Sequence, residues 1–358
     1  MTEIDISSVP FGEHDGKPVT LWTIMRQTTL GPVTLSMTDF GATIQRLILP
    51  DAKGTPTDIA LGYDTLAEYV TCDTYFGATV GRYGNRIRAG HVMLDGNSTQ
   101  LDLNEGHNHL HGGRRGFDKV VWAGAPTVEG DGLSFQLTSP DGDMGYPGKL
   151  EIIVTYRLTA QGGLDVDMTA TTDRTTICNV VQHSLWNLGG HAAGHVRDHV
   201  AQLAAGFVTP VDDDLIPTGE VCRVDGTPFD FGTAKPIGRD MSALTAAGYD
   251  HNLVLGLLDA EGWRDCADVL CPANGLGFRL RTDQPAVQFY AGTYLTPDVV
   301  GKGNVPYQAN AGFALETQIF PDSPHHAHFP QAILRSHDTY RHRMAYSFYH
   351  AGPASTQA

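Results

Sequence analysis

Four stretches of the chain alternate between two kinds of side chain with a period of two. Apolar or ring-bearing side chains occupy every second position in segments 150–158, 164–170, 276–280 and 340–348. Successive side chains of a strand point to opposite faces, so each segment predicts a half-buried β-strand. Turn-like segments such as SPDGDMGYPGK separate them, in a chain with 41 glycines and 20 prolines. The pattern predicts an all-β protein, a large antiparallel β-sandwich.

Helical periodicity is scarce by comparison. Short helices are expected over residues 64–69 and 241–247, with Asp64 and Asp240 as their N-caps. We find no internal repeat, and no linker or change in composition divides the chain. The sequence therefore predicts a single domain over residues 1–358 with a few short helices.

The charge balance excludes several classes of partner. The net charge of −16 argues against binding to nucleic acid or to an anionic membrane surface. No apolar run approaches the roughly 20 residues of a membrane span, and the polar N-terminus does not look like a secretory signal. Five cysteines, an odd number without a CxxC motif, favour a reducing compartment. We expect a cytoplasmic protein, either a monomer or a homodimer.

Groups suited to proton transfer lie in separate polar segments. His111 lies in NHLHGGRRGFDK, His183 in QHSLWNLGG and Glu316 in GFALETQIFPD. Imidazole and carboxyl groups are the usual acids and bases of enzymes near neutral pH. The segments GRYGNRI, GYDHN and AVQFYAG add guanidinium, amide and carboxylate groups that can bind hydroxyls.

Cofactor and metal signatures are weak or missing. The sequence has no GxGxxG after a strand, no P-loop, no GxSxG and no HExxH, so no nucleotide or redox cofactor is expected. Two histidine clusters, 107–111 and 325–328, lack a partner carboxylate with ligand spacing, and we expect no metal. His107 and His109 are interpreted as bystanders of His111.

An ordered set of segments resembles the aldose 1-epimerase (galactose mutarotase) family nearly end to end. It comprises TYFGATVGRYGNRIRAG, LDLNEGHNHLHGGRRGFDKVVW, SPDGDMGYPG, QHSLWNLGGH, LIPTGEV, GYDHN, AVQFYAGTYL and GFALETQIFPDSPHHAHFP. The resemblance implies a galactose mutarotase-like supersandwich with a shallow, open sugar cleft. It also implies a cofactor-free isomerase that interconverts the α and β anomers of a free aldose, a hexose or a pentose.

The resemblance also implies residue roles. Opening a sugar ring removes a proton from the anomeric hydroxyl and adds one to the ring oxygen. Glu316 matches the family's base, His183 its acid, and His111 a second histidine that binds the sugar near the ring oxygen. The matching sugar contacts are Asn85, Arg86, Asp250 and Gln288.

The surrounding residues refine these roles. The apolar start of GFALETQ suggests a strand, and partial burial of Glu316 would raise its pKa. Gly112 and Gly113 are expected to let the backbone approach a ligand. GYDHN could equally form a turn in which Asp250 bonds its own backbone. The rings of Trp186, Phe289 and Tyr290 could line the cleft or lie in the core.

The chain departs from the family pattern near His183, and three other functions stay open. The family commonly has Asn before this histidine and an aromatic Tyr-Phe pair after it. This chain has Gln182 before it and Ser184-Leu185-Trp186 after it, so the cleft wall and substrate preference are expected to differ. A glycoside hydrolase could use Asp250 and Glu316 as its carboxylate pair. A noncatalytic carbohydrate-binding sandwich would need Arg86 and Asp250. A sugar-phosphate epimerase would need extra cationic groups, for which Arg114 and Arg115 are the adjacent candidates.

Overall fold

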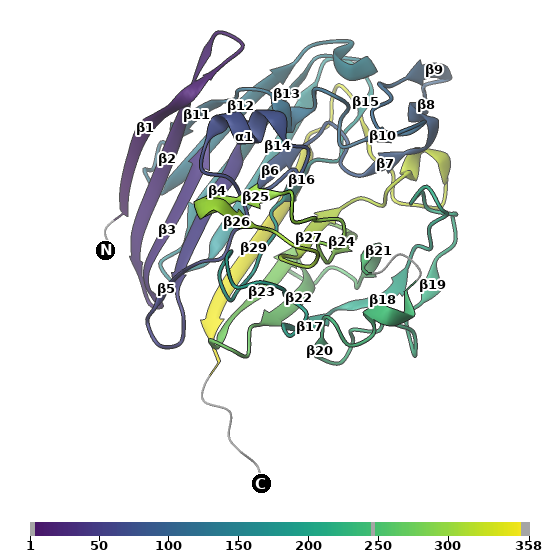
Figure 1. Ribbon diagram of the computed structural model, residues 1–358. Coiled ribbons are helices and arrows are strands. Elements are labelled where there is room, and N and C mark those ends of the chain that lie inside the picture. The colour runs from purple at the N-terminus through teal and green to yellow at the C-terminus, as the bar shows by residue number, and fades with distance from the viewer. Residues whose placement is uncertain (1–3, 245–247, 352–358) are drawn as a thin grey trace.

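A nine-stranded antiparallel sheet runs through the molecule (Figure 1). The computed structural model describes residues 4–244 and 248–351. In spatial order the sheet contains β11 (Ala123–Pro126), β12 (Gly132–Ser139), β13 (Leu150–Leu158), β14 (Leu164–Thr172), β29 (Tyr340–His350), β23 (Leu276–Thr282), β22 (Arg264–Leu270), β17 (Val200–Leu203) and β20 (Lys235–Pro236).

The four segments with period-two alternation form the centre of this sheet. They are β13, β14, β29 and β23, which are consecutive neighbours. In β13, Leu150, Ile152 and Val154 are buried, whereas Glu151 and Ile153 between them are exposed. The alternation arises because one face packs on the core and the other meets solvent. The predicted all-β fold class is confirmed.

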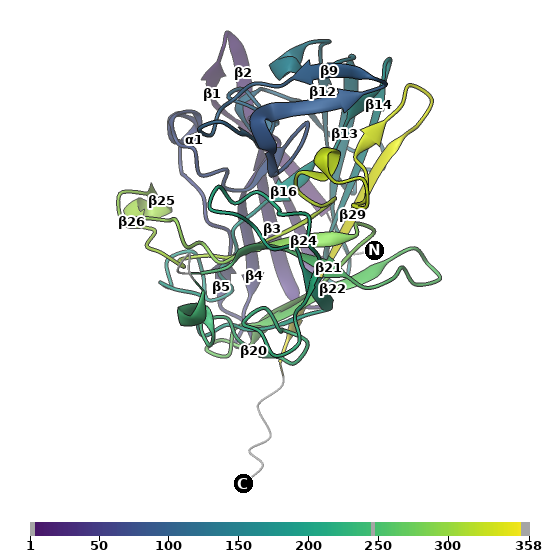
Figure 2. The same cartoon turned by 90° about the vertical axis from the view of Figure 1, so that its right-hand side faces the viewer.

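Two five-stranded antiparallel sheets share a core with the large sheet. The first contains β1 (Ile4–His14), β2 (Lys17–Thr28), β3 (Gly31–Thr38), β4 (Thr43–Pro50) and β5 (Pro56–Asp58). The other contains β19 (Cys222–Arg223), β18 (Ala205–Val208), β21 (Asp250–Leu255), β24 (Ala286–Tyr290) and β27 (Ala314–Gln318). Leu35, Phe278 and Phe289, one from each sheet, belong to the same buried cluster. One buried apolar cluster therefore spans all three sheets, whose arrangement Figure 2 shows from the side.

Short strand pairs connect the sheets. They are β6 (Ala78–Val80) with β16 (Val181–His183), β7 (Arg86–Ile87) with β10 (His109–Leu110), β8 (His91–Leu94) with β9 (Asn97–Gln100), β15 (Thr176–Ile177) with β28 (Ile333–Leu334), and β25 (Val300–Gly301) with β26 (Val305–Pro306). Two of these pairs carry predicted site residues. His183 is the last residue of β16, Arg86 is the first residue of β7, and His111 follows β10 directly.

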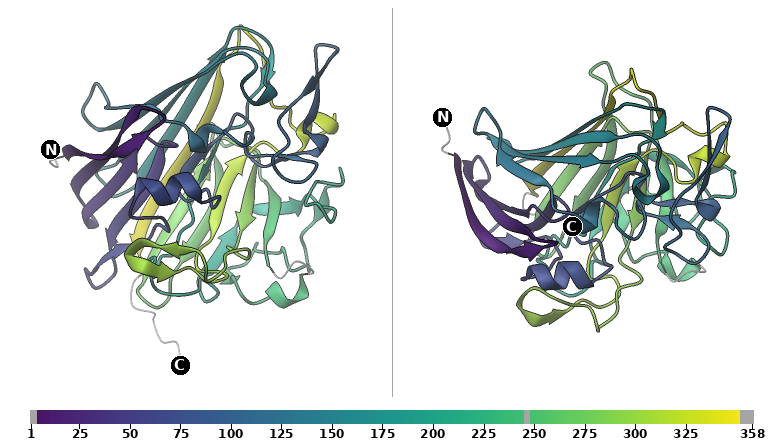
Figure 3. Two further views of the ribbon diagram at one scale, coloured as in Figure 1. Left: turned by 45° about the horizontal axis from the view of Figure 1, so that its top comes forward. Right: turned by 90° about the horizontal axis from the view of Figure 1, so that it is seen from above.

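The first expected helix is present, but its cap differs from the prediction. α1 spans Leu66–Thr71 and lies beside the β25–β26 hairpin (Figure 3). Thr65 and Glu68 form a reciprocal capping box at its start. Asp64 is therefore not the N-cap. Its carboxylate pairs with Arg46 and accepts a hydrogen bond from the Gly303 N–H.

The second expected helix is shorter than predicted within the described residues. A single 3-10 turn spans Met241–Ala243, and Asp240 makes no side-chain cap, because its carboxylate pairs with Lys235 and Arg239. Residues 245–247 of this prediction lie outside the described residues. The other 3-10 turns are Arg88–Gly90, Phe117–Lys119, Asp143–Gly145, Lys302–Asn304 and Ser323–His325. In the part of the chain that the structure describes, no helix is long and apolar enough to cross a membrane.

Candidate active site

A cleft of about 250 Å³ opens where β27, β24 and β21 meet β16 and the loops around β7 and β10. Its lining includes all but one of the predicted site residues: Asn85, Arg86, His111, His183, Asp250 and Glu316. Ligand clefts in proteins usually measure about 300–1,000 Å³. The volume lies just below this range, so the cleft is suited to a small ligand.

His183 and Glu316 face each other across neighbouring strands. His183 ends β16, Glu316 lies in β27, and an antiparallel bridge joins Trp186 to Phe313. His183 precedes Trp186 by as many residues as Glu316 follows Phe313, so this register puts the two side chains opposite each other. His183 Nε2 lies 3.6 Å from Glu316 Oε1, beyond ordinary hydrogen-bond distance. The two atoms can therefore approach two oxygens bonded to the same carbon.

Burial sets the protonation of this pair. His183 is 6% exposed and Glu316 2% exposed. Burial raises the pKa of Glu316 well above its usual value; Asp250 adds to this effect and Arg86 opposes it. Burial also lowers the pKa of His183 to about 4, although Asp250 opposes that shift. The site thus favours the uncharged form of each group. The expected elevation of the Glu316 pKa is present, with nearly complete rather than partial burial.

His111 is held in one tautomer by the backbone. Its Nδ1 accepts a hydrogen bond from the Asn85 N–H at 3.1 Å. In a neutral imidazole the other nitrogen, Nε2, must then carry the proton. Burial lowers the pKa of His111 well below its usual value, and the neighbouring His183 and Arg86 lower it further. His111 is therefore a neutral hydrogen-bond donor, which is suited to binding an oxygen atom.

Asn85 and Arg86 are partly occupied by bonds within the protein. Asn85 Oδ1 accepts from the Arg86 N–H at 2.8 Å, which leaves the Asn85 amide nitrogen as the group available to a ligand. Arg86 donates from Nε and Nη2 to both oxygens of Glu105, at 2.7 and 2.6 Å. Among the described residues, no hydrogen-bond partner occupies Arg86 Nη1. The pair therefore presents donors to the cleft.

Asp250 lies in a strand and not in a turn. It opens β21 and pairs with Tyr290 of β24, so the turn interpretation of GYDHN is wrong.

Gln288 is the predicted site residue outside the cleft lining. Its Nε2 donates to Asp250 Oδ1 at 2.7 Å. Gln288 thus supports the carboxylate from behind and leaves Asp250 Oδ2 to accept hydroxyls.

A buried amide network fixes the orientation of Gln288. Gln318 is fully buried, and its Nε2 donates to Asn252 Oδ1 at 3.0 Å and to Gln288 Oε1 at 3.3 Å. Because Gln288 Oε1 accepts there, its nitrogen must point to Asp250. Neither Gln318 nor Asn252 was identified from the sequence.

Further cleft residues were also missed. The ring of Tyr75 packs on His111 and His183, with centroid distances of 4.6 and 5.6 Å. Glu105 and Tyr294 also line the cleft. Tyr75 lies in TYFGATVG and Glu105 in NEGHNHLHGG, two segments that carried the resemblance, but no local pattern distinguishes these positions from their neighbours.

For the cleft wall, one interpretation was left open and two others need correction. Trp186 and Phe289 are buried in the core, and of the three rings considered Tyr290 lines the cleft. A Cβ at Gly112 would lie 1.7 Å from the carbonyl oxygen of Gly81, so this glycine permits packing against the chain's own backbone, not against a ligand. Gln182 is buried and bonds to Gly77. The departure that reaches the cleft wall is Leu185.

Two basic side chains considered for phosphate binding lie elsewhere. Arg114 pairs with Asp102 and Arg115 with Asp15, and both guanidinium groups are mostly exposed. Neither residue belongs to the cleft lining. Among the described residues that line the cleft, Arg86 is the only lysine or arginine.

His111, His183 and Glu316 are also close enough together to be considered as metal ligands. A ligating nitrogen must be unprotonated, but the Asn85 N–H directs the proton of His111 to Nε2. His109 is excluded by its own contacts, since its two nitrogens bond to Asp102 O and Tyr146 Oη. The donor set fits binding to sugar oxygens better than binding to a metal.

Comparisons with known proteins agree with this geometry. A model of the aldose 1-epimerase family matches residues 28–347. A galactose mutarotase from Bos taurus is 40% identical over 309 residues, covering 86% of this chain and 89% of that protein. An aldose 1-epimerase from Escherichia coli is 34% identical over 351 residues, covering 96% and 99%. A solved aldose epimerase homologue from C. elegans superposes with a TM-score of 0.84 at 30% identity, covering 91% of this chain and 98% of that one.

These relatives are similar over nearly the whole of this chain and of their own chains, and the family match includes every residue of the cleft. The fold is also shared with the solved homologue from C. elegans. The chain therefore belongs to the aldose 1-epimerase family of isomerases.

Proposed function

We propose that this protein interconverts the α and β anomers of a free aldose, with Glu316 as the base and His183 as the acid. The supporting observation is the 3.6 Å separation of His183 Nε2 and Glu316 Oε1 in a small cleft of about 250 Å³. The anomeric carbon bears both the hydroxyl that loses a proton and the ring oxygen that gains one. One carboxylate and one imidazolium side by side therefore suffice to open the ring.

Ring opening moves two protons. Glu316, ionised, takes the proton of the anomeric hydroxyl while protonated His183 gives one to the ring oxygen. Both groups are then uncharged, which is the state that burial favours. Before opening, the proton of Glu316 passes to His183, and hydrogen bonds from sugar hydroxyls stabilise the ionised carboxylate that this transfer leaves. After the aldehyde carbon turns its other face, His183 removes the proton from the attacking hydroxyl and Glu316 returns one to the aldehyde oxygen.

The remaining cleft residues hold the sugar in register. His111 Nε2–H, the amide nitrogen of Asn85 and the guanidinium of Arg86 are donors, whereas Asp250 Oδ2 is an acceptor. A sugar hydroxyl both donates and accepts, so this mixed set suits it. Such positioning converts binding energy into correct orientation of the anomeric carbon against the pair. The cytoplasmic location and the choice between monomer and homodimer stay predictions from the sequence.

Polarimetry of freshly dissolved sugars tests this function. α-Glucose, α-galactose, xylose and arabinose should reach their equilibrium rotation faster with the protein than without it, and the final rotation should not change. A methyl glycoside has no anomeric hydroxyl and should give no change. Release of reducing sugar from that glycoside would instead support a glycoside hydrolase. Sugar binding without faster mutarotation would support a noncatalytic binding protein.

A further inference from the structure

Asp322 is a fully buried carboxylate outside the cleft. Its side chain is 0% exposed, and its φ of +54° is in the left-handed region. It follows the strand that carries Glu316, at the start of the 3-10 turn Ser323–His325. A buried carboxylate is costly unless its oxygens accept hydrogen bonds, so its partners indicate what it holds in place.

Those partners lie on both sides of Ile87. They belong to segment 83–88, which we call the sugar-binding loop because it carries Asn85 and Arg86 of the cleft lining. The Asp322 N–H donates to the Arg86 carbonyl at 2.9 Å. Asp322 Oδ1 accepts from the Arg88 backbone N–H, also at 2.9 Å. In extended chain, the carbonyl of one residue and the N–H two residues later point to the same side. Asp322 thus occupies the position of a neighbouring strand along this edge.

The other edge of the same short strand is also paired. β7, which carries Arg86, pairs with β10, which immediately precedes His111. Arg86 therefore lies between the segment that leads to His111 and the segment that follows Glu316. Without the Asp322 contacts, β7 would be a two-residue strand held on one side.

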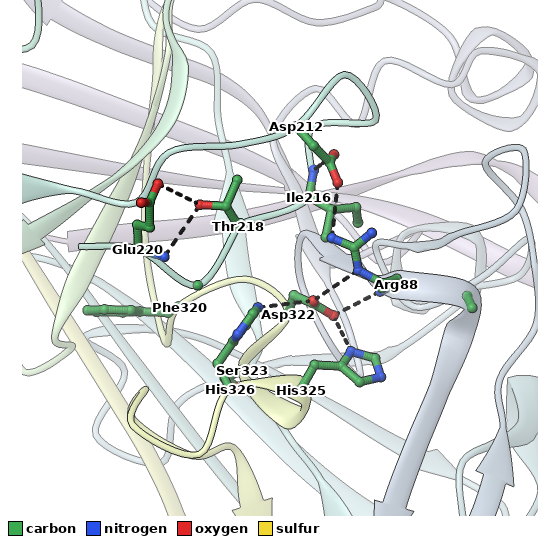
Figure 4. Close-up of polar contacts among 12 residues, drawn as sticks. Arg88, Asp212, Ile216, Thr218, Glu220, Phe320, Asp322, Ser323, His325 and His326 are labelled. Atoms are coloured by element: carbon green, nitrogen blue, oxygen red, sulfur yellow. Dashed lines mark hydrogen bonds and ion pairs between the residues drawn. The ribbon is translucent and has the colours of Figure 1, made fainter. Parts of the chain in front are cut away.

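The rest of the cluster orients the Asp322 carboxylate (Figure 4). His325 Nδ1 lies 2.6 Å from Oδ1, and His326 Nε2 lies 3.5 Å from Oδ2. The Arg88 guanidinium lies 4.0 Å from Asp322 and bonds to Asp212 at 3.0 Å. These side chains belong to no part of the cleft lining, so the cluster acts on the cleft through the backbone of residues 86–88.

Hydrogen bonds of Tyr83 join the sugar-binding loop to segment 320–323 independently of Asp322. Tyr83 Oη donates to the Phe320 carbonyl at 2.9 Å and accepts from the Ser323 N–H at 3.2 Å. Tyr83 lies three residues before Arg86, and its two partners, Phe320 and Ser323, lie on either side of Asp322 in sequence. The segment 320–323 is thus attached to the sugar-binding loop at two places.

We propose that Asp322 is a positioning residue for sugar binding: by fixing the backbone around Ile87, it aims the Arg86 side chain into the cleft. This inference rests on the proposed function, in which Arg86 binds the substrate. Arg86 is expected to bind the ground state and transition state alike. Loss of its positioning should therefore raise KM and leave kcat little changed.

Three substitutions separate this role from general stability. Asp322→Gly keeps a residue that accepts the left-handed backbone but removes the acceptor, and KM should rise about tenfold, since a small misplacement of a binding group weakens its contacts. Asp322→Asn keeps both the acceptor and tolerance of that backbone, and its KM should stay within about threefold of wild type. Asp212→Asn alters only the ion pair between Asp212 and the Arg88 guanidinium, and it should leave KM and kcat unchanged.

A double substitution tests whether Asp322 acts through Arg86. Arg86→Ala alone should raise KM, and adding Asp322→Gly should raise it no further, because residues that act as one unit are not additive. Full additivity, a normal KM in Asp322→Gly, or a loss confined to kcat would overturn the proposal. Should Asp322→Gly not fold, Tyr83→Phe loosens the same junction and should raise KM less, with a normal KM counting against the proposal.

The outcomes also separate this inference from the proposed function. If the wild-type protein does not accelerate mutarotation, the function itself is wrong. If it does, but Arg86→Ala leaves KM unchanged, the role of Arg86 is wrong and the proposal for Asp322 fails with it. If Arg86→Ala raises KM and Asp322→Gly does not, only the positioning role is wrong.

Discussion

The two sides of the cleft are built by different means. His183, Asp250 and Glu316 lie on regular strands, where pairing with neighbours fixes each side chain. Tyr75, Asn85 and His111 lie in loops with φ values of +54°, +64° and +51°. Such backbone is uncommon outside glycine and persists only where surrounding contacts hold it. On the strand side, the strand register fixes the positions of the side chains. On the loop side, hydrogen bonds to distant segments fix them.

The comparison suggests a division of labour. Under the proposed function, the strand side holds the pair that moves protons together with the acceptor Asp250, and the loop side holds mostly donors that bind the sugar. If this division is correct, substitutions of His183 or Glu316 should lower kcat and substitutions on the loop side should raise KM. The following predictions test it.

The largest effect is expected on the strand side. Glu316→Gln removes the base while keeping the shape of the side chain, and kcat should fall by about 10²–10⁴-fold. Polarimetry on α-galactose measures the loss, and circular dichroism checks that the fold is kept. A variant that mutarotates sugars at nearly the wild-type rate would show that Glu316 is not the base.

The two histidines compare the sides directly. His183→Asn should lower kcat steeply, because asparagine cannot supply a proton to the ring oxygen. His111→Asn should lower kcat less and raise KM more, because an amide still donates a hydrogen bond as the neutral His111 does. Steady-state polarimetry on both variants is the test. If His111→Asn abolishes turnover while His183→Asn changes only KM, the acid is on the loop side.

A smaller effect concerns stability. Because burial raises the pKa of Glu316, its contribution to stability is full below the unfolded pKa and is lost as pH rises toward the folded pKa. Each unit of elevation corresponds to about 1.4 kcal/mol. Glu316→Gln cannot ionise, so its Tm should exceed that of wild type by a few degrees at pH 8 and approach it near pH 4.5. Thermal unfolding across this range measures the difference; a constant difference at all pH values contradicts the stated cause.

The smallest effect is expected from chelation. A metal bound by His111, His183 and Glu316 would join the two sides, but the tautomer of His111 opposes this. Mutarotation should therefore be unchanged after dialysis against EDTA. Activity that disappears on chelation and returns with one added metal would require a metal centre.

The same division explains how far the sequence could predict the site. The alternation in segment 150–158 and the apolar start of GFALETQ identified strands because strand burial leaves a local pattern. Asp322 could not be found in this way, because its partner Arg88 is 234 residues away. Glu105 was missed for a similar reason, since its bond to Arg86 depends on how the loop folds. For Gln288 the resemblance implies a sugar contact, and the strand pairing adds a bond that the sequence could not predict, from Gln288 Nε2 to Asp250 Oδ1.

The bridge between Trp186 and Phe313 has an evolutionary consequence. A single residue inserted or deleted between that bridge and His183 or Glu316 would turn one of the pair to the opposite face of its strand. Substitutions here can be tolerated one at a time, but a change of length removes half of the pair at once. We therefore expect active descendants of this gene to differ in residue identity along 183–186 and 313–316 while keeping both stretches free of insertions and deletions.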